Sequence, residues 1–313
     1  MLPFSLRRLA SLAPIWLLIT FMAFLVAVLA PGDPARVILE RQGGERPTEA
    51  EVTQLRHHLH LDEPVPQQYA RWLGRAVRGD LGNSYRGDPV LSTIAMRFGS
   101  SLRLALPALL LAIAVAVPLG AVSAVLRGSL VDGLARAATL AGGSTPSFVL
   151  GYLLIIFLSV KLHLLPVAGT GSWRHAVLPT VTLAVGSTAA LTRLSRSSLL
   201  DALGDDYVRT ARAKGVPERA VVMAHAMRNS LLPLVTLTGI RFGRLLAGAA
   251  IVETVFSWPG LGRYMVESIN DRDYPAIQGV VIFTGTIFVL VNLVTDLLCA
   301  RLDPRIHMFS EAA

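Results

Sequence analysis

The sequence has little charge, one cysteine and two lysines. Charged residues make up 16% of its 313 residues, against about 25% in a typical soluble domain. The lone Cys299 excludes an intrachain disulfide, and without a nearby set of His and Asn or Asp we interpret it as a packed residue, not a catalytic thiol. Neither Lys161 nor Lys214 is followed by Ser or Thr. The sequence therefore lacks the Gly-Lys-Ser/Thr element of a P-loop that would bind ATP.

Long apolar runs are present instead, and hydrophobic residues make up 53% of the chain. Six runs approach the roughly 20 residues that a helix needs to cross a bilayer. The first is longer than a signal-peptide core of about 7–15 residues and has no clean cleavage site, so we interpret it as a span. We predict an all-α polytopic membrane protein with six transmembrane helices. They lie at about residues 9–30, 101–126, 137–162, 176–200, 229–252 and 277–300.

Basic residues in short loops predict the orientation of these spans. If the N-terminus is cytoplasmic, the short outside loops hold only Arg174, Arg263 and Arg272. We therefore expect both termini to be cytoplasmic. Because the net charge of +8 reflects this bias, we expect no nucleic-acid partner. The inside segments hold Arg7, Arg8, Arg127, Arg136, Arg193, Arg196, Arg209, Arg212, Lys214, Arg219, Arg228, Arg301 and Arg305.

Residues 1–313 are predicted to form a single transmembrane domain with an external subdomain at about 31–99 and a cytoplasmic segment at about 201–228. In the external subdomain, Thr48 and Glu51 have the spacing of a capping box, which predicts a short helix over 49–59. A second helix is predicted over 66–77, with Tyr69 on its apolar face.

Three histidines, His57, His58 and His60, follow one another closely in the external subdomain. Two of them could share a helix face and hold a metal ion, but no carboxylate stands at a fixed distance from them. We favour a solvated polar surface and expect no metal site.

The cytoplasmic segment contains a short helix with signals at both ends. Asp205 and Asp206 stand at its start, where a carboxylate can cap free amides and suits the helix dipole. Gly215 can adopt the left-handed conformation that ends a helix, and Pro217 bars its continuation. A helix this short is not stable alone in water, so it must dock onto something.

Two surfaces could receive this helix. The first is the lipid surface, on which the helix could lie passively because the segment is basic. However, its apolar face comprises only Tyr207, Val208 and Ala211, which is small for membrane insertion. The composition therefore favours a protein partner.

The same segment resembles a known motif. DYVRTARAKGV (206–216) is similar to the coupling motif in the permease subunits of binding-protein-dependent ABC importers, in which Glu-Ala-Ala is followed by three residues and Gly. RTA (209–211) stands in place of Glu-Ala-Ala, and Gly215 is the Gly. The closing Leu-Pro is LP (232–233), further from the Gly than in the general pattern, as is usual in the peptide and nickel branch.

Further stretches resemble the first membrane subunit of dipeptide, oligopeptide and nickel importers, and the resemblance covers essentially the whole chain. Its most specific parts are the stretch at 253–279 and the coupling segment. The stretches are LAPGDPA (29–35), LDEPVPQQYARWLGRAVRGDLGNSY (61–85), ETVFSWPGLGRYMVESINDRDYPAIQG (253–279) and LDPRI (302–306).

The resemblance implies a type I ABC importer permease at the bacterial cytoplasmic (inner) membrane, with no catalysis and no cofactor of its own. Its implied partners are a second homologous permease, two ATPase subunits that bind ATP and Mg, an external substrate-binding protein and the lipid bilayer. The solute stays open among dipeptides, oligopeptides, glutathione-like peptides, nickel and metal–chelator complexes. The implied ATPase-coupling residues are Asp206, Tyr207, Arg209, Thr210, Ala211, Arg212, Lys214 and Gly215.

The predicted fifth span carries two arginines, although charge at bilayer depth is costly. On an ideal helix Gly239 and Gly243 lie about 40° apart, whereas Arg241 and Arg244 lie at about 200° and 140° from Gly239. We expect the glycine face to pack on a neighbouring helix and the arginine face to meet an aqueous lumen or a partner chain. Counted from Asn229, Arg241 is about 18 Å deep, too deep for easy snorkelling.

Three interpretations of Arg241 and Arg244 stay open. They could line the translocation path and attract an anionic group of the solute. They could pair with a carboxylate, for example on the second permease, since Asp296 is a poor match in depth. The span could also be shifted so that both lie in the interface. The pair departs from the resemblance, so its role cannot be carried over from the family.

Two other functions compete with the importer permease. A stand-alone secondary transporter is the main alternative, but such proteins often show inverted repeats, and we find no internal repeat. A membrane enzyme would need an intramembrane nucleophile–base or metal constellation, and none is evident in the sequence.

Overall fold

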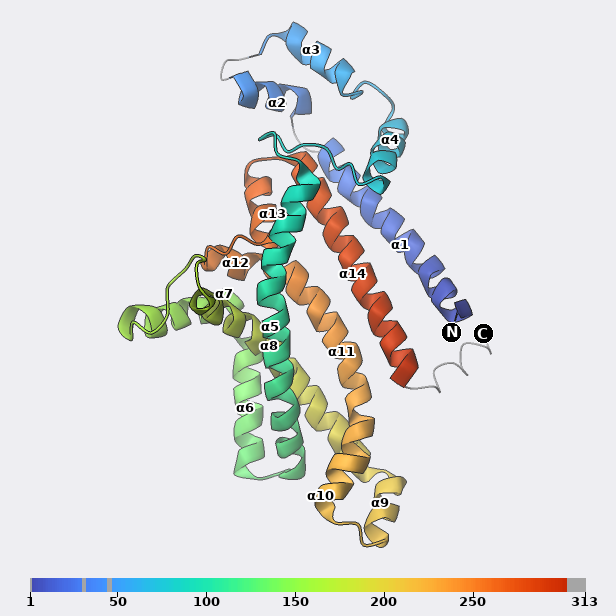
Figure 1. Ribbon diagram of the computed structural model, residues 1–313, viewed down its shortest axis with the longest axis vertical. Helices are drawn as coiled ribbons and strands as arrows, with labels where there is room; N and C mark the ends of the chain where they lie inside the picture. The colour runs from blue at the N-terminus through green and yellow to red at the C-terminus, as the bar shows by residue number, and fades with distance from the viewer. Residues whose placement is uncertain (1, 30–31, 44–46, 303–313) are drawn as a thin grey trace. The chain divides into compact units, whose positions relative to one another are not determined.

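The computed structural model describes residues 2–29, 32–43 and 47–302 (Figure 1), with side chains from residue 12 onward except at 41–43, 247, 248 and 302. Several predicted features therefore lie outside the described residues. They are most of the LDPRI segment, Arg305 and the side chains of Arg7 and Arg8.

The chain forms two compact units, which are described separately. One comprises Met1–Gly99 and Tyr264–Val289, and the other Ser100–Arg263 and Leu290–Ala313. Across the described residues the secondary structure is helical, apart from an isolated β-bridge between Asn83 and Pro89. The predicted all-α fold is confirmed.

Four described helical segments are long and apolar enough to cross a membrane. Each overlaps most of one predicted span, although the helices begin and end at other residues than predicted. Of α1 (Leu2–Val28), the part described with its side chains, Leu12–Val28, is apolar but shorter than a span, so the count of six spans stays a prediction. The four segments are α5 (Val90–Val125), α8 (Trp173–Gly204), α14 (Tyr274–Leu302), and the run of α10 (Glu218–Ala220), η2 (Val221–Ala226) and α11 (Met227–Gly248).

The third predicted span, 137–162, is a broken helix and not the single continuous helix that was predicted. The structure has α6 (Leu130–Ser144), then α7 (Ser147–Leu154) running into the π-helix η1 (Ile155–Lys161), with a bend of 103° between the two parts. The physical cause is Pro146, because a residue that precedes proline is driven out of the helical conformation. Thr145 is accordingly extended, with φ −79° and ψ 123°. This break shapes the pocket described below.

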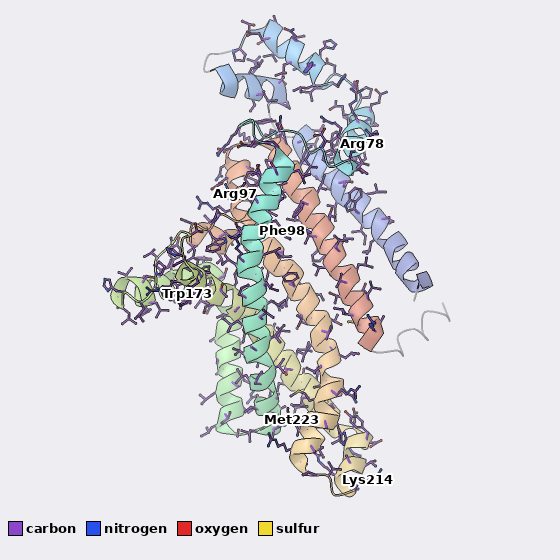
Figure 2. All side chains as sticks on the ribbon, viewed as in Figure 1. Arg78, Arg97, Phe98, Trp173, Lys214 and Met223 are labelled. Carbon is purple, nitrogen blue, oxygen red and sulfur yellow. The ribbon has the colours of Figure 1, made fainter. Side chains whose placement is uncertain are left out.

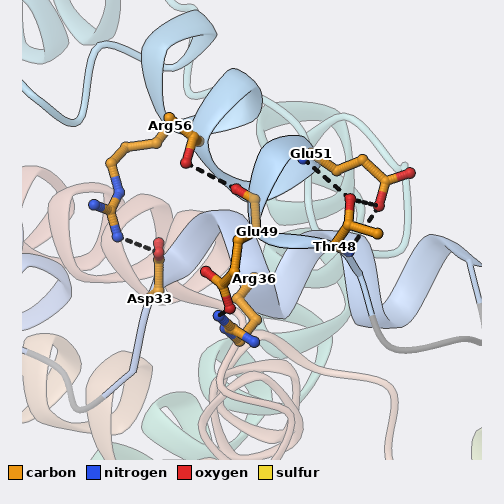
Figure 3. Close-up of polar contacts among 7 residues, drawn as sticks. Asp33, Arg36, Thr48, Glu49, Glu51 and Arg56 are labelled. Atoms are coloured by element: carbon orange, nitrogen blue, oxygen red, sulfur yellow. Dashed lines mark hydrogen bonds and ion pairs between the residues drawn. The ribbon is translucent and has the colours of Figure 1, made fainter.

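Three short helices follow α1 in the first unit: α2 (Pro34–Gly43), α3 (Glu49–His58) and α4 (Val65–Val77). The predicted capping box is confirmed at the start of α3 (Figure 3). Thr48 Oγ1 accepts from the Glu51 amide at 3.4 Å, and the Thr48 amide donates to Glu51 Oε2 at 2.8 Å. The helix α2 was not predicted. Its Arg36 contacts Glu49 of α3 at 2.5 Å.

The apolar face of α4 packs on α1 through aromatic rings. Tyr69 lies edge-on to Phe21 with 5.3 Å between ring centroids, and Phe24 lies 5.6 Å from Trp72. The Tyr69 hydroxyl also lies 2.8 Å from the Thr20 hydroxyl. The prediction that Tyr69 belongs to the apolar face is therefore confirmed.

The three histidines lie at the end of α3 and in the turn after it. His57 Nδ1 is 3.2 Å from Asp62 and His60 Nδ1 is 3.1 Å from Glu63, and both histidine side chains are exposed. Among the described residues, no three His, Cys, Asp or Glu side chains are arranged to hold a metal ion.

A buried carboxylate organises the turn after α11 in the second unit. Glu253, in α12 (Ala250–Val255), is fully buried and accepts from the Ser101 hydroxyl at 2.6 Å and from the Arg263 amide at 2.9 Å. A side chain at Gly260 would overlap this carboxylate, since its Cβ would lie 2.1 Å from the Glu253 carboxyl carbon. This explains the glycine of the WPGLG stretch before α13 (Leu261–Asn270).

Candidate functional site

The short helix predicted over 205–215 is present as α9 (Asp206–Ala213), which lies with α10 at the end of α8 (Figure 1). Two of its three apolar side chains, Val208 and Ala211, are buried, and only Tyr207 is exposed. The chain itself thus provides the surface on which Val208 and Ala211 pack. The sequence had instead favoured a protein partner for this apolar face. The other buried members of this cluster are Ala121, Ala124, Leu199, Ala202, Val221, Val222 and Ala226.

The C-terminal end of α9 is closed as the sequence predicts. Gly215 has φ +76°, its amide donates to the Arg212 carbonyl at 3.0 Å, and the Val216 amide donates to the Ala211 carbonyl at 3.3 Å. These two bonds form a Schellman motif, which requires the left-handed conformation that glycine adopts readily. Val216 packs against the buried cluster, so the cap also anchors the turn.

The N-terminal cap differs from the prediction. Asp205 has the extended conformation of an N-cap residue, but its side chain makes no cap hydrogen bond. Its backbone carbonyl instead accepts from the amides of Val208 and Arg209. The carboxylate of Asp206 faces Arg209 at 3.3 Å. The prediction that the Asp205 side chain caps the helix is therefore wrong, although the helix begins where predicted.

The outward face of α9 is polar and open. The predicted coupling residues Asp206, Arg209, Thr210 and Lys214 are all exposed, and Figure 2 shows Lys214 at the tip of this end of the unit. The structure thus brings the predicted coupling residues together on one small surface. Only Ala211 among them is buried.

An ion pair closes the loop between α9 and α10. Arg212 donates from Nε to Glu218 Oε2 at 3.0 Å and from Nη2 to Glu218 Oε1 at 2.6 Å. The hydrogen bonds that Arg212 donates to the Glu218 carboxylate raise the pKa of Arg212 above its ordinary value. Arg212 therefore stays charged and holds α9 to the start of α10.

The two arginines predicted for the fifth span line one pocket of about 190 Å³. Its walls come from α11, from the middle of α8 and from the break between α6 and α7. The lining includes Thr145, Ser147, Thr182, Gly186, Arg241 and Arg244.

The opposite face of α11 is packed as predicted. A Cβ at Gly239 would lie 2.0 Å from Thr295 Oγ1 of α14, so the glycine lets the two helices approach closely. The glycine and arginine faces are thus separated as the helical geometry requires.

Arg241 Nε is one of a few buried side-chain polar atoms that have no hydrogen-bond partner among the described residues. A buried donor left unpaired costs about 1–3 kcal/mol. Neither Arg241 nor Arg244 makes a hydrogen bond or ion pair with any carboxylate among the described residues. Within the chain as described, the interpretation of a structural ion pair has no support.

A different arginine does form such a pair, which was not predicted from the sequence. Asp132, at the start of α6, is almost fully buried and accepts from Arg196 of α8 at 2.7 Å and 2.9 Å. It also accepts from the Ser123 hydroxyl at 2.6 Å and the Gly128 amide at 3.1 Å. The contact crosses 64 residues, so no local spacing could indicate it.

Comparison with known proteins agrees with this architecture. Residues 116–308 match the family described as binding-protein-dependent transport system inner membrane component, and residues 1–105 match the N-terminal part described for the same membrane components. The chain belongs to this family. It is a permease subunit of an ABC importer in the inner membrane and not an enzyme, since ATP hydrolysis in this family is carried out by separate subunits.

Two relatives match over nearly their whole length. The glutathione transport system permease protein GsiC of Pectobacterium atrosepticum is 41% identical over 308 residues, covering 98% of this chain and 99% of the relative. The protein of the same name from Escherichia coli is 41% identical over 309 residues, with the same coverage.

One solved structure shares the fold. A chain from an inward-facing structure of the MetNI methionine ABC transporter has a TM-score of 0.58 at 19% identity, covering 69% of this chain and 98% of that one. These comparisons decide between the functions that the sequence left open, in favour of the importer permease over a stand-alone secondary transporter.

Proposed function

We propose that this chain forms the translocation path of an ATP-driven importer together with a second, homologous permease, two ATPase subunits and an external substrate-binding protein. The termini and α9 then face the cytoplasm, as the distribution of basic residues predicts. Segments 31–99 and 201–228 serve as the external subdomain and the coupling segment of a single permease domain.

The observation that carries the coupling role is the division of α9 into two faces. Val208 and Ala211 are buried against α5, α8 and η2, so a displacement of α9 moves the ends of these helices. The opposite face, with Tyr207, Arg209 and Thr210, is exposed and fits a groove on an ATPase subunit. ATP-driven closure of the ATPase pair would then move α8 and α11 and alternate access to the path.

Substitution of Gly215 tests the coupling role. A Cβ at Gly215 meets no atom within 4 Å, so a large side chain there projects away from the chain into the space that the ATPase would occupy. We expect Gly215→Trp to abolish transport and to reduce co-purification of the ATPase by at least about tenfold, a loss of 1.4 kcal/mol of binding free energy. Membrane insertion should be unchanged.

Gly215→Asn is the matched control, because asparagine tolerates the left-handed conformation without the bulk of tryptophan. It should retain transport and ATPase binding. If Gly215→Trp transported normally with a normal ATPase complement, docking through this helix would be disproved.

For the solute, we propose a short peptide of the glutathione type. The support is the 41% identity over nearly the full length to two permeases named for glutathione transport. The test is uptake of labelled glutathione by the complete complex with its own binding protein, with nickel and a neutral dipeptide measured in parallel. Uptake of nickel but not of glutathione would assign the other solute class.

A further inference from the structure

The pocket that holds Arg241 and Arg244 also receives the start of a helix. Thr145 and Ser147, on either side of Pro146, line the pocket with the two arginines. Ser147 is the first residue of α7, whose N-cap residue Pro146 has no side chain that could cap it. The two arginines of α11 and the start of α7 therefore line the same cavity.

The start of α7 adds positive potential to the pocket. The first bond onto the helix runs from the Leu150 amide to the Pro146 carbonyl at 3.1 Å, so the amides of the first turn before Leu150 have no acceptor within the helix. Such an end carries about half a positive charge and binds anions. Broken membrane helices in transporters direct their N-terminal ends at anionic groups in this way.

The end of α6 opposes this effect, because its last carbonyl groups would favour a cation. The Ala141 carbonyl accepts from the Thr145 amide at 3.1 Å and from the Thr145 hydroxyl at 2.8 Å. Two full positive charges stand in the same cavity, and none of the described residues that line it carries a carboxylate. The pocket is therefore suited to an anion.

The unpaired Nε of Arg241 gives the chemistry of that anion. A guanidinium presents parallel N–H groups that match a carboxylate or phosphate in a two-point contact. Because Nε is buried and unpartnered while Arg244 is more exposed, a ligand that satisfies both must enter the pocket and not stop at its mouth.

We propose that this pocket binds a carboxylate of the transported solute, held by Arg241 and Arg244 and by the start of α7 at Ser147. The proposal rests on the proposed function and deepens it, since it makes the permease itself select peptides with a free carboxylate. A cavity of about 190 Å³ accepts one end of a short peptide. A phosphate, free or on a lipid headgroup, has similar chemistry, and the test separates it.

The test places a thiol in the pocket and measures the local charge. Gly186 lines the cavity, and a Cβ there meets no atom within 4 Å. Because Cys299 is the only cysteine of the chain, Gly186→Cys in a Cys299→Ser background carries a single thiol. The intact complex, in vesicles of neutral phosphatidylcholine, is treated with methanethiosulfonates that bear either a sulfonate or a trimethylammonium group.

We expect the sulfonate reagent to react faster than the cationic one at residue 186. In the Arg241→Gln/Arg244→Gln background this rate ratio should fall by about tenfold, as expected when unit charges several ångströms away are removed at an effective dielectric constant of about 20. Gly204→Cys is the matched control. Its Cβ also meets no atom within 4 Å, it lies outside the pocket, and its ratio should not change.

Protection by ligands identifies the source of the anion. S-methylglutathione, which has no free thiol, should slow labelling at residue 186 in the arginine-containing complex, and its diester should not. Stronger protection by inorganic phosphate or by anionic lipid than by S-methylglutathione would overturn the assignment to a solute carboxylate. If both reagents reacted at an equal rate in the complex, the pocket would not be a free anion site. The same result is expected if a carboxylate of the second permease fills the pocket, and it would overturn the proposal in that case too.

These outcomes are distinct from failure of the proposed solute. If the complex does not take up glutathione, yet residue 186 prefers the sulfonate reagent and is protected by another carboxylate-bearing peptide, the pocket stands and only the named solute falls. If glutathione is taken up at the normal rate by the Arg241→Gln/Arg244→Gln variant, the pocket assignment falls and the proposed function stands.

Discussion

Two arginines of the same unit show opposite ways of placing a guanidinium in an apolar chain. Arg196 is held by Asp132, which is further bonded to Ser123 and Gly128. Arg241 has a buried Nε without a partner and lines a cavity with Arg244. The first arrangement is complete within the chain and therefore structural. The second is incomplete among the described residues, and we propose that its partner arrives from outside the chain.

The largest effect is expected from breaking the complete arrangement. Asp132→Asn keeps the size of the side chain but removes its charge, leaving Arg196 without a counter-charge and the Ser123 hydroxyl with a weaker acceptor. Removing one partner of a buried pair is strongly destabilising, and we expect the melting temperature of the complex to fall by more than about 5 °C. Thermal unfolding of the purified complex, followed by size-exclusion chromatography, measures this.

The double variant Asp132→Leu/Arg196→Met is the control for this prediction. Replacing a buried pair by apolar residues of similar size is often neutral or stabilising, so it should regain most of the lost stability. An Asp132→Asn complex as stable as the wild type would remove the distinction between the two arrangements.

A second prediction concerns the incomplete arrangement. Arg241→Gln should leave the melting temperature within about 2 °C of the wild type, because the side chain loses no partner and an unpaired buried donor is removed. Uptake of an anionic peptide should nevertheless fall at least about tenfold, the effect of losing 1.4 kcal/mol of interaction. Stability and uptake are thus expected to separate here, whereas they fall together in Asp132→Asn.

Charge reversal sharpens this prediction. Arg241→Glu/Arg244→Glu should abolish uptake of the anionic peptide while the complex still assembles, as judged by co-purification of its subunits. Loss of assembly instead of uptake would show that a carboxylate of the second permease fills the pocket. Unchanged uptake would exclude a role in the translocation path.

The sequence predicted those features that depend on local spacing. Apolar length located the spans, the pair Thr48 and Glu51 predicted the capping box, and helical geometry separated Arg241 from Gly239. In each case the relevant residues are within a few positions of one another, so the backbone geometry alone relates them.

The missed features depend on contacts that are distant in sequence or on a single backbone conformation. Asp132 and Arg196 meet only when α6 packs on α8. The break at Pro146 was overlooked because the apolar run continues across it, and hydropathy does not register the conformation of Thr145. The pocket required both the break and α11, so sequence reasoning could predict its arginines but not their surroundings.

The smallest effect is expected from a third arginine, which is paired but exposed. Arg212 and Glu218 are 42% and 57% exposed, and solvent screens such pairs so that they contribute little to stability. Arg212→Gln should therefore shift the melting temperature by no more than about 1 °C. Because the pair links α9 to the start of α10, the ratio of solute transported to ATP hydrolysed should nevertheless fall.

The charge-swapped variant Arg212→Glu/Glu218→Arg decides whether the pair or the individual charges matter. If the pair acts as a link within the chain, the swap restores the ratio of transport to ATP hydrolysis. If Arg212 acts directly on the ATPase, the swap fails to restore it although the link is present. If Arg212→Gln lowered the melting temperature as much as Asp132→Asn, the size of the effect would not follow the burial of the ion pair. Burial and pairing would then not distinguish structural from functional arginines in this chain.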